Sequence, residues 1–206
     1  HGLGADGGDF EPLVRQWGLA EQLDTRFVFP HAPRRPVSLN QGMVMRAWYD
    51  IYDMGFAGSE DSEGIETARQ HLLALVRRER ERGIDSNRIL LAGFSQGGAV
   101  VLHTALRSTA PFAGVLALSS YLPLAESLAE EKCADAERTR IRMDHGDRDS
   151  VVPLRAAEHS CATIEAQGYQ VEFHKYAMDH GLCAPQMKSL RAWITSRISE
   201  ATQPIA

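Results

Sequence analysis

The sequence predicts an α/β protein with a mainly parallel central sheet and helices on both faces. Short continuous apolar runs, typical of strands buried on both faces, recur along the chain. Segments with apolar residues at helical spacing separate these runs, and such an alternation is the pattern of parallel sheets. The chain has 206 residues and neither a repeat nor a Pro/Ser-rich linker, so we expect a single domain over residues 1–206.

Each expected element follows from its local pattern. Phe27, Val28 and Phe29 before Pro30 predict a first short strand at 26–30. Helical spacing that ends at Gly83 predicts a long helix at 64–82. The remaining patterns predict strands at 88–94, 114–119, 140–145 and 169–176, and helices at 99–106, 153–167 and 185–198. Functional groups of such sheets gather where the strands end at their carboxyl edge.

Composition excludes several classes of function. The net charge of −5, with acidic and basic residues mixed, gives no basic footprint for nucleic acid. No run of 18 apolar residues exists, so stable membrane insertion is not expected. The three cysteines fit neither a zinc pattern nor a disulfide framework, which favours reduced thiols and a cytoplasmic protein without a bound metal. The chain does not begin with Met, so the sequence leaves open a segment upstream of His1.

A candidate nucleophile follows the second expected strand directly. Gly-Phe-Ser-Gln-Gly at 93–97 places Ser95 between a buried strand and a helix. A serine on such a tight turn has strained backbone geometry, and flanking glycines avoid clashes. This context is typical of the nucleophile in α/β-hydrolases. The backbone N–H of Gln96, at the helix start, would face an oxyanion formed at the attacked carbon.

The partners of Ser95 follow from the chain order Ser, acid, His. Of the histidines after the candidate acids, His159 falls inside a helix and His174 inside a strand, which leaves His180 in a loop just past a strand. Asp149 is the favoured acid, in the loop after the 140–145 strand. Asp147, two residues away in the same loop, remains its rival.

The glycine-rich start permits two interpretations. Gly2, Gly4 and Gly7 satisfy the dinucleotide pattern G-x-G-x-x-G, but the next expected strand ends without the acidic residue that a ribose requires. In the favoured interpretation the glycines let the backbone approach the substrate. The Leu3 N–H then joins that of Gln96 as the oxyanion hole.

Five motifs together carry a more specific resemblance. They are His-Gly-Leu-Gly at 1–4, Pro-His-Ala-Pro at 30–33, Trp-Tyr-Asp at 48–50, Gly-Phe-Ser-Gln-Gly-Gly at 93–98, and His-Gly-Asp-Arg-Asp at 145–149 with Val-Pro at 152–153. The chain resembles the carboxylesterase and acyl-protein thioesterase (lysophospholipase-like) family, and its bacterial carboxylesterases in particular. The resemblance implies an α/β-hydrolase fold without a large cap domain, no cofactor, and a triad of Ser95, Asp149 and His180. It also favours Asp149 over Asp147.

Two further expectations concern the surroundings of this triad. Members of the family carry an apolar strand immediately before His-Gly-Leu-Gly, and that strand is expected to be absent from this chain, which begins at His1. Trp48, Met43 and Met178 are candidates for lining an acyl groove, although core packing is the commoner role of these residue types. His31, between two prolines, is expected to form hydrogen bonds in a rigid loop rather than to catalyse.

The favoured function is a serine carboxylesterase that acts on short- to medium-chain esters. The alternatives are an acyl-protein thioesterase or lysophospholipase with the same triad and, more distantly, an inactive α/β scaffold used for binding. A nicotinamide-dependent oxidoreductase is disfavoured because the dinucleotide motif lacks its acidic residue. The expected partner is a small-molecule ester that could be lipid-like, and a homodimer stays open because an apolar groove rim would suit it.

Overall fold

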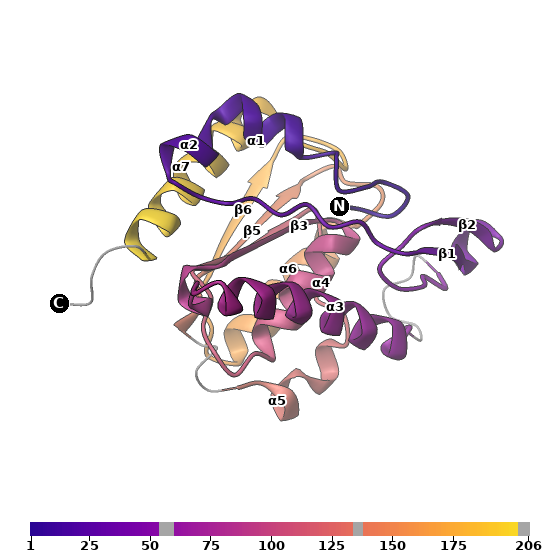
Figure 1. The fold of residues 1–206 in the computed structure, drawn as a ribbon. Coiled ribbons are helices and arrows are strands. Elements are labelled where there is room, and N and C mark those ends of the chain that lie inside the picture. The colour runs from indigo at the N-terminus through magenta and orange to yellow at the C-terminus, as the bar shows by residue number, and fades with distance from the viewer. Residues whose placement is uncertain (54–59, 134–137, 202–206) are drawn as a thin grey trace.

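The computed structural model describes residues 1–53, 60–133 and 138–201, and Figure 1 shows their arrangement. The central sheet has the order β3-β4-β5-β6, and all its neighbouring strands are parallel. These strands are β3 (Leu90–Phe94), β4 (Gly114–Leu118), β5 (Ile141–Gly146) and β6 (Val171–Tyr176). The four corresponding predictions are confirmed to within two residues at each end.

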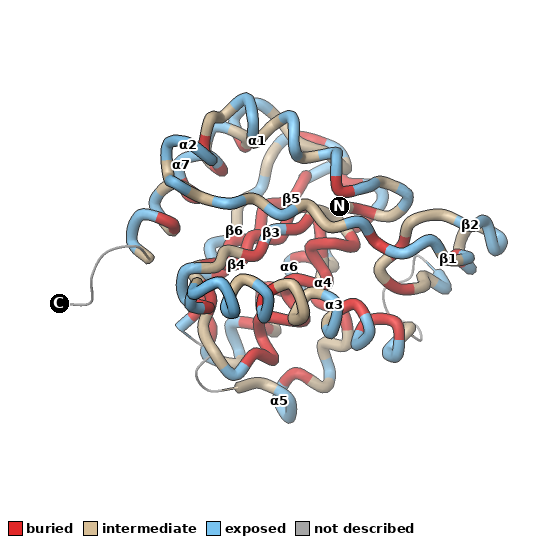
Figure 2. Tube along the Cα trace, in the orientation of Figure 1, coloured by how far each residue is buried: buried red, intermediate tan, exposed pale blue. Residues whose placement is uncertain are grey.

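Helices cover both faces of this sheet because the strands are apolar on both faces. In β4, Val115 and Ala117 join one hydrophobic cluster, whereas Leu116 and Leu118 join another. The first cluster includes side chains of α3 (Ser62–Glu81), α4 (Gln96–Leu106) and α6 (Leu154–Ala166). The second includes side chains of α2 (Leu19–Gln22) and α7 (Ala184–Ala201), beside α1 (Glu11–Trp17). Figure 2 shows the buried residues along the strands and α4, and this parallel sheet with helices on both faces agrees with the expected α/β-hydrolase fold.

The strand expected at residues 26–30 is a wrong prediction. Within the described ranges, this segment belongs to no strand. Phe27 instead packs against the cluster under α7, and the rings of Phe27 and Phe29 stack with centroids 6.3 Å apart. The apolar pattern therefore reflects packing without strand pairing. The same segment lies against the glycine-rich start, where a Cβ on Gly7 would collide with the backbone of Phe29.

An antiparallel hairpin that the sequence analysis missed lies beside the sheet. It joins β1 (Arg34–Val37) to β2 (Met43–Arg46), with Val37 opposite Met43. The connection uses Gln41 and Gly42 with positive φ. Pro36 within the first strand obscured the pattern, because proline is confined to particular strand positions.

The remaining elements are short. A four-residue helix, α5 (Leu128–Glu131), follows β4, and 3₁₀ helices lie at Ser38–Asn40, Ser86–Arg88 and Ala125–Ser127. Across the three described ranges, no helix is both long enough and apolar enough to cross a membrane.

Candidate active site

Ser95 occupies the turn between β3 and α4 in strained backbone geometry. Its φ of 53° and ψ of −118° are unusual for a residue with a side chain, and strain of this kind is common at functional sites. The Ser95 N–H donates to the Leu118 carbonyl at 2.8 Å, and the Ser120 hydroxyl donates to the Ser95 carbonyl at 2.8 Å. A Cβ on Gly93 would collide with the backbone of Gly97. Gly93 therefore permits the close crossing of strand and helix that presents Ser95, whereas Gly97 permits the approach of the His1 backbone.

Asp149 is fixed in the loop that follows β5. Its Oδ1 accepts from the N–H groups of Val151 at 2.9 Å and Val152 at 2.8 Å. Its Oδ2 lies 2.7 Å from His180 Nδ1, and the Asp149 side chain has no exposed surface. The side chain of Asp147, by contrast, is 48% exposed and lies 3.7 Å from the Arg148 guanidinium. The structure thus brings Asp149, and not Asp147, to His180.

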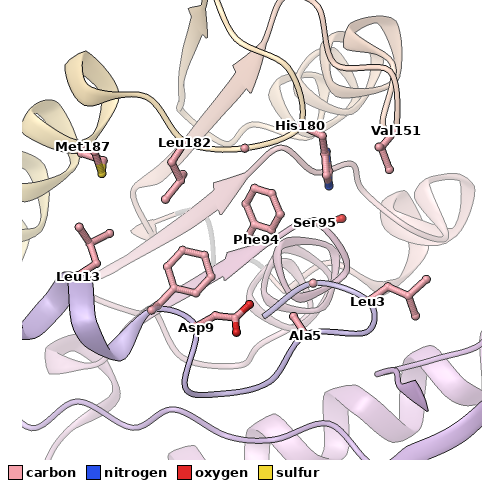
Figure 3. Close-up of a pocket in the computed structure, with 13 residues that line it drawn as sticks. Leu3, Ala5, Asp9, Leu13, Phe94, Ser95, Val151, His180, Leu182 and Met187 are labelled. Carbon is pink, nitrogen blue, oxygen red and sulfur yellow. The ribbon is translucent and has the colours of Figure 1, made fainter. Parts of the chain in front are cut away.

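His180 lies in the loop after β6, with its ring against Phe94 at a centroid distance of 4.8 Å. A carboxylate only accepts hydrogen bonds, so Nδ1 carries the proton in the pair with Asp149 and Nε2 keeps a lone pair. Figure 3 shows the His180 ring and the Ser95 hydroxyl pointing toward one another. This arrangement can remove a proton from Ser95. The two rejected histidines, His159 and His174, lie in α6 and β6 as expected.

The glycine-rich start packs directly against the nucleophile turn. A Cβ on Gly2 would lie 3.3 Å from Ser95 Cβ, so the segment that carries Leu3 runs beside the serine. The Gly4 N–H donates to the Arg46 carbonyl at 2.9 Å. The Gly7 N–H donates to His31 Nδ1 at 3.0 Å, which confirms the hydrogen-bonding role predicted for His31.

The side chain of Gln96 and the indole of Trp48 connect these parts. Gln96, 2% exposed, accepts from the Trp48 N–H and donates to the Tyr49 carbonyl, both at 2.8 Å. Trp48 Nε1 donates to the His1 carbonyl at 3.0 Å. Hydrogen bonds therefore connect Gln96, which follows Ser95, through Trp48 to His1, which precedes Gly2.

A pocket of about 620 Å³ opens over Ser95 and His180, a volume within the usual range for small-molecule sites. Apolar residues dominate its wall. In Figure 3, Leu13, Leu182 and Met187 lie on one side of Ser95, and Leu3 and Val151 on the other. The residues that line the pocket are Gly2, Leu3, Ala5, Asp9, Phe10, Leu13, Phe94, Ser95, Val151, His180, Gly181, Leu182 and Met187.

The three residues expected along an acyl groove lie elsewhere in the structure. Met43 is 64% exposed on the hairpin, and Met178 is buried in the loop before His180, where its carbonyl accepts from the Arg148 N–H. Trp48 contacts the His1 ring. None of the three lines the pocket, whose walls come instead from residues between 2 and 13, from Phe94 and Val151, and from residues between 180 and 187. Phe10 and Leu13, just after the glycine-rich start, were the signal that the sequence analysis missed.

Other reactive groups lie outside this pocket. Within the part of the chain that the structure describes, no cluster of three or more His, Cys, Asp or Glu side chains suited to a metal ion occurs. The three cysteines are free thiols, and burial raises the pKa of Cys161 to about 11. Cys161 is therefore protonated at neutral pH and a poor nucleophile.

Sequence comparison relates the chain to known proteins. Residues 1–198 match the phospholipase/carboxylesterase family. An acyl-protein thioesterase 1 from Neurospora crassa is 36% identical over 207 residues, covering 96% of this chain and 84% of the relative. A probable carboxylesterase from Oryza sativa subsp. japonica is 32% identical over 206 residues, covering 98% and 77%.

Solved structures show the same relationship. The crystal structure of Arabidopsis thaliana SOBER1 superimposes with a TM-score of 0.90 at 28% identity, covering 96% of both chains. That of Zea mays acyl-protein thioesterase 2 gives a TM-score of 0.76 at 25% identity, covering 96% of this chain and 91% of the other.

Proposed function

Because the chain belongs to the phospholipase/carboxylesterase family and is a serine hydrolase, we propose that it cleaves short- to medium-chain carboxylic esters through an acyl-enzyme on Ser95. One observation carries the assignment of residues. The 2.7 Å hydrogen bond from His180 to the buried Asp149 leaves the other ring nitrogen facing a serine in a strained turn. This is the arrangement that nucleophilic acyl transfer requires.

In the first half of the reaction, Ser95 Oγ attacks the ester carbonyl while His180 Nε2 takes the hydroxyl proton. The Asp149 carboxylate holds the imidazole in the required tautomer and stabilises the imidazolium. As the tetrahedral intermediate collapses, the bond to the leaving alcohol breaks and His180 returns the proton to that alcohol. In the second half, water replaces Ser95 as the nucleophile, and His180 again transfers its proton. The acid is released and the Ser95 hydroxyl is restored.

The backbone N–H groups of Leu3 and Gln96 are proposed as the donors to the oxyanion. Gln96 is the first residue of α4, where a helix presents unpaired N–H groups and the positive end of its dipole. Leu3 follows Gly2, which packs against Ser95, and it lines the pocket. Donors preorganised in this way stabilise the charge that develops in the transition state.

The apolar pocket supports an acyl ester as the substrate class. Its wall consists mainly of aliphatic and aromatic side chains, and Asp9 is the carboxylate among its lining residues. Burial of the apolar part of a substrate there contributes binding energy roughly in proportion to its area, about 25 cal/mol per Å².

A thioester substrate is the second candidate, and the relatives favour it. Two fungal proteins named acyl-protein thioesterase 1 are 36% and 35% identical to this chain. The triad chemistry is the same for both substrates, because a thiol replaces the alcohol as leaving group.

A series of p-nitrophenyl esters from acetate to palmitate tests the proposal, with Ser95→Ala as the control and thioesters of the same acyl chains in parallel. We expect Ser95-dependent hydrolysis that is fastest for butyrate to octanoate. A thioester rate well above that of its matched ester would favour the second candidate. The proposal would be contradicted if the folded wild-type protein hydrolysed neither series. It would also be contradicted if Ser95→Ala hydrolysed the substrates as fast as the wild type.

A further inference from the structure

A second histidine touches the acid of the triad. His145, the fifth residue of β5, is only 1% exposed. Its Nε2 lies 2.8 Å from the Val152 carbonyl oxygen and 3.5 Å from Asp149 Oδ2. This Oδ2 is the same oxygen that accepts from His180 Nδ1 at 2.7 Å. Two imidazole rings therefore share one carboxylate oxygen.

The contact with Val152 defines the protonation of His145. A carbonyl oxygen only accepts hydrogen bonds, so His145 Nε2 must carry the hydrogen. The same N–H then presents its positive end to Asp149 Oδ2. His145 thus faces Asp149 Oδ2 through its Nε2–H, whereas His180 donates to the same oxygen through Nδ1.

The hydrogen bonds of His145 also close the turn that holds Asp149. Asp149 Oδ1 accepts from the N–H groups of Val151 and Val152, which fixes the start of the turn to its end. His145 binds the carbonyl of Val152 and so fixes the end of the turn to β5. The carboxylate thus has partners on both oxygens before any substrate binds.

Burial favours the neutral form of His145. Burial lowers the pKa of His145 below its ordinary value, and the nearby His180 acts in the same direction. The hydrogen bond to Val152 and the charges of Asp149 and Glu158 raise the pKa of His145 but do not reverse the shift. A neutral ring supplies a dipole to Asp149, whereas a charged ring would compete with the His180 imidazolium for the same carboxylate.

We propose that His145 is a positioning residue that, as a neutral Nε2–H donor, fixes the turn of residues 149–152 and so holds the Asp149 carboxylate where it binds His180. The role in catalysis rests on the proposed function. Without this donor, the Val152 carbonyl loses its partner in β5, and the turn that carries Asp149 is less firmly held. The hydrogen bond between Asp149 and His180 would then be weaker, and His180 would be less well oriented toward Ser95.

The test is the ¹H NMR resonance of the hydrogen that His180 Nδ1 donates to Asp149, together with kcat, in the wild-type protein, His145→Leu and His145→Gln. Glutamine places an amide N–H₂ near the position of Nε2, and leucine has a similar size without a donor. His159→Gln, at an exposed position of α6, is the matched control. We expect the resonance of the His180 Nδ1 hydrogen to move upfield, and kcat to fall about tenfold or more, in His145→Leu, because the carboxylate is then held less firmly against the ring. Both should stay unchanged in the other two variants.

An unchanged His180 resonance in folded His145→Leu, or the same change in His145→Gln, would overturn the proposal. If His145→Leu does not fold, the tautomer of wild-type His145 decides, read from long-range ¹H–¹⁵N ring correlations. The neutral Nε2–H form is expected near neutral pH, and an Nδ1–H or charged ring would overturn the proposal. These spectra need no substrate, so their failure contradicts the role of His145, whereas absence of Ser95-dependent hydrolysis contradicts the proposed function.

Discussion

Two carboxylates on or just after β5 form short hydrogen bonds to a cationic or basic partner, and they differ in what that partner can still do. Asp144 binds Arg142 through two hydrogen bonds of 2.7 and 3.0 Å, and neither side chain is more than 3% exposed. Asp149 binds His180 at 2.7 Å, with the His180 side chain 16% exposed. Distance and burial of the carboxylate are thus nearly the same in both pairs.

The difference lies on the side of the partner. Arg142 also donates to the Tyr176 hydroxyl at 3.1 Å and to the Ser189 hydroxyl at 2.9 Å, so its guanidinium ties β5 to β6 and α7. His180 instead keeps one ring nitrogen toward a pocket and a serine. A buried pair stabilises the fold when the hydrogen-bonding groups of its basic side chain are all engaged by the protein. It can take part in catalysis when one nitrogen of the basic side chain remains available to the substrate. Three substitutions test this contrast, and a fourth experiment tests how burial acts on a histidine outside both pairs.

Replacement of the acid of the second pair should have the largest effect. Asp149→Asn should lower kcat by about 10³- to 10⁴-fold, because an amide does not hold His180 in the required tautomer. Hydrolysis of p-nitrophenyl butyrate measures the rate, and urea unfolding measures the stability. A folded variant with nearly wild-type kcat would show that Asp149 is not the catalytic acid.

The same replacement in the first pair should act on stability alone. Asp144→Asn leaves the Arg142 guanidinium buried without its counter-ion, which should cost about 3 to 5 kcal/mol of unfolding free energy. The kcat of the folded fraction should remain within about twofold of wild type, since α7 and not the pocket covers this pair. A large fall in kcat at unchanged stability would remove the distinction between the two pairs.

Burial of His103 in α4 should make the free energy of unfolding depend on pH. Burial lowers its pKa to about 4, so the folded protein binds this proton less readily than the unfolded chain does. The contribution of neutral His103 is fully present above about pH 6.5 and is lost as the pH falls toward 4. The loss should reach roughly 3 kcal/mol.

Urea unfolding of wild type and His103→Gln between pH 7 and 4 measures this contribution. The difference between the two proteins should shrink or reverse as the pH falls. Parallel curves over the whole range would show that the folded protein does not lower the pKa of His103.

The smallest effect is expected for Asp147, the rival acid in the sequence. Its side chain is half exposed and its ion pair with Arg148 spans 3.7 Å. Asp147→Asn should therefore change stability by less than about 0.5 kcal/mol and leave kcat within about twofold of wild type. It is the matched control for Asp149→Asn, and a comparable loss of kcat in both variants would place the acid in doubt.

Sequence reasoning located the elements in which a clear hydrophobic pattern lies next to a candidate catalytic residue. The buried strand before Ser95 and the loop position of His180 are both visible in one dimension. The choice between Asp149 and Asp147 was not, because two residues of one loop differ only in which of them folds back onto the ring. The family resemblance favoured Asp149, and the geometry agrees.

The wrong predictions concern residues whose surroundings are set by contacts between distant parts of the chain. Phe27 and Phe29 carry a strand-like pattern that tertiary packing satisfies without pairing. Trp48 was considered for the acyl groove, but its indole N–H binds the His1 carbonyl. The pocket walls at Phe10 and Met187 lie far apart in sequence and meet only in the fold. The cytoplasmic location, the homodimer and the single domain over residues 1–206 stay predictions.

The central claim is that Ser95 is the nucleophile, and labelling with a fluorophosphonate tests it most directly. We expect one phosphonyl group per chain, located on Ser95 by peptide mass spectrometry. Labelling should be abolished in Ser95→Ala, strongly slowed in Asp149→Asn and unchanged in Asp147→Asn. No labelling of the folded wild-type protein, or labelling at another residue that persists in Ser95→Ala, would contradict the claim.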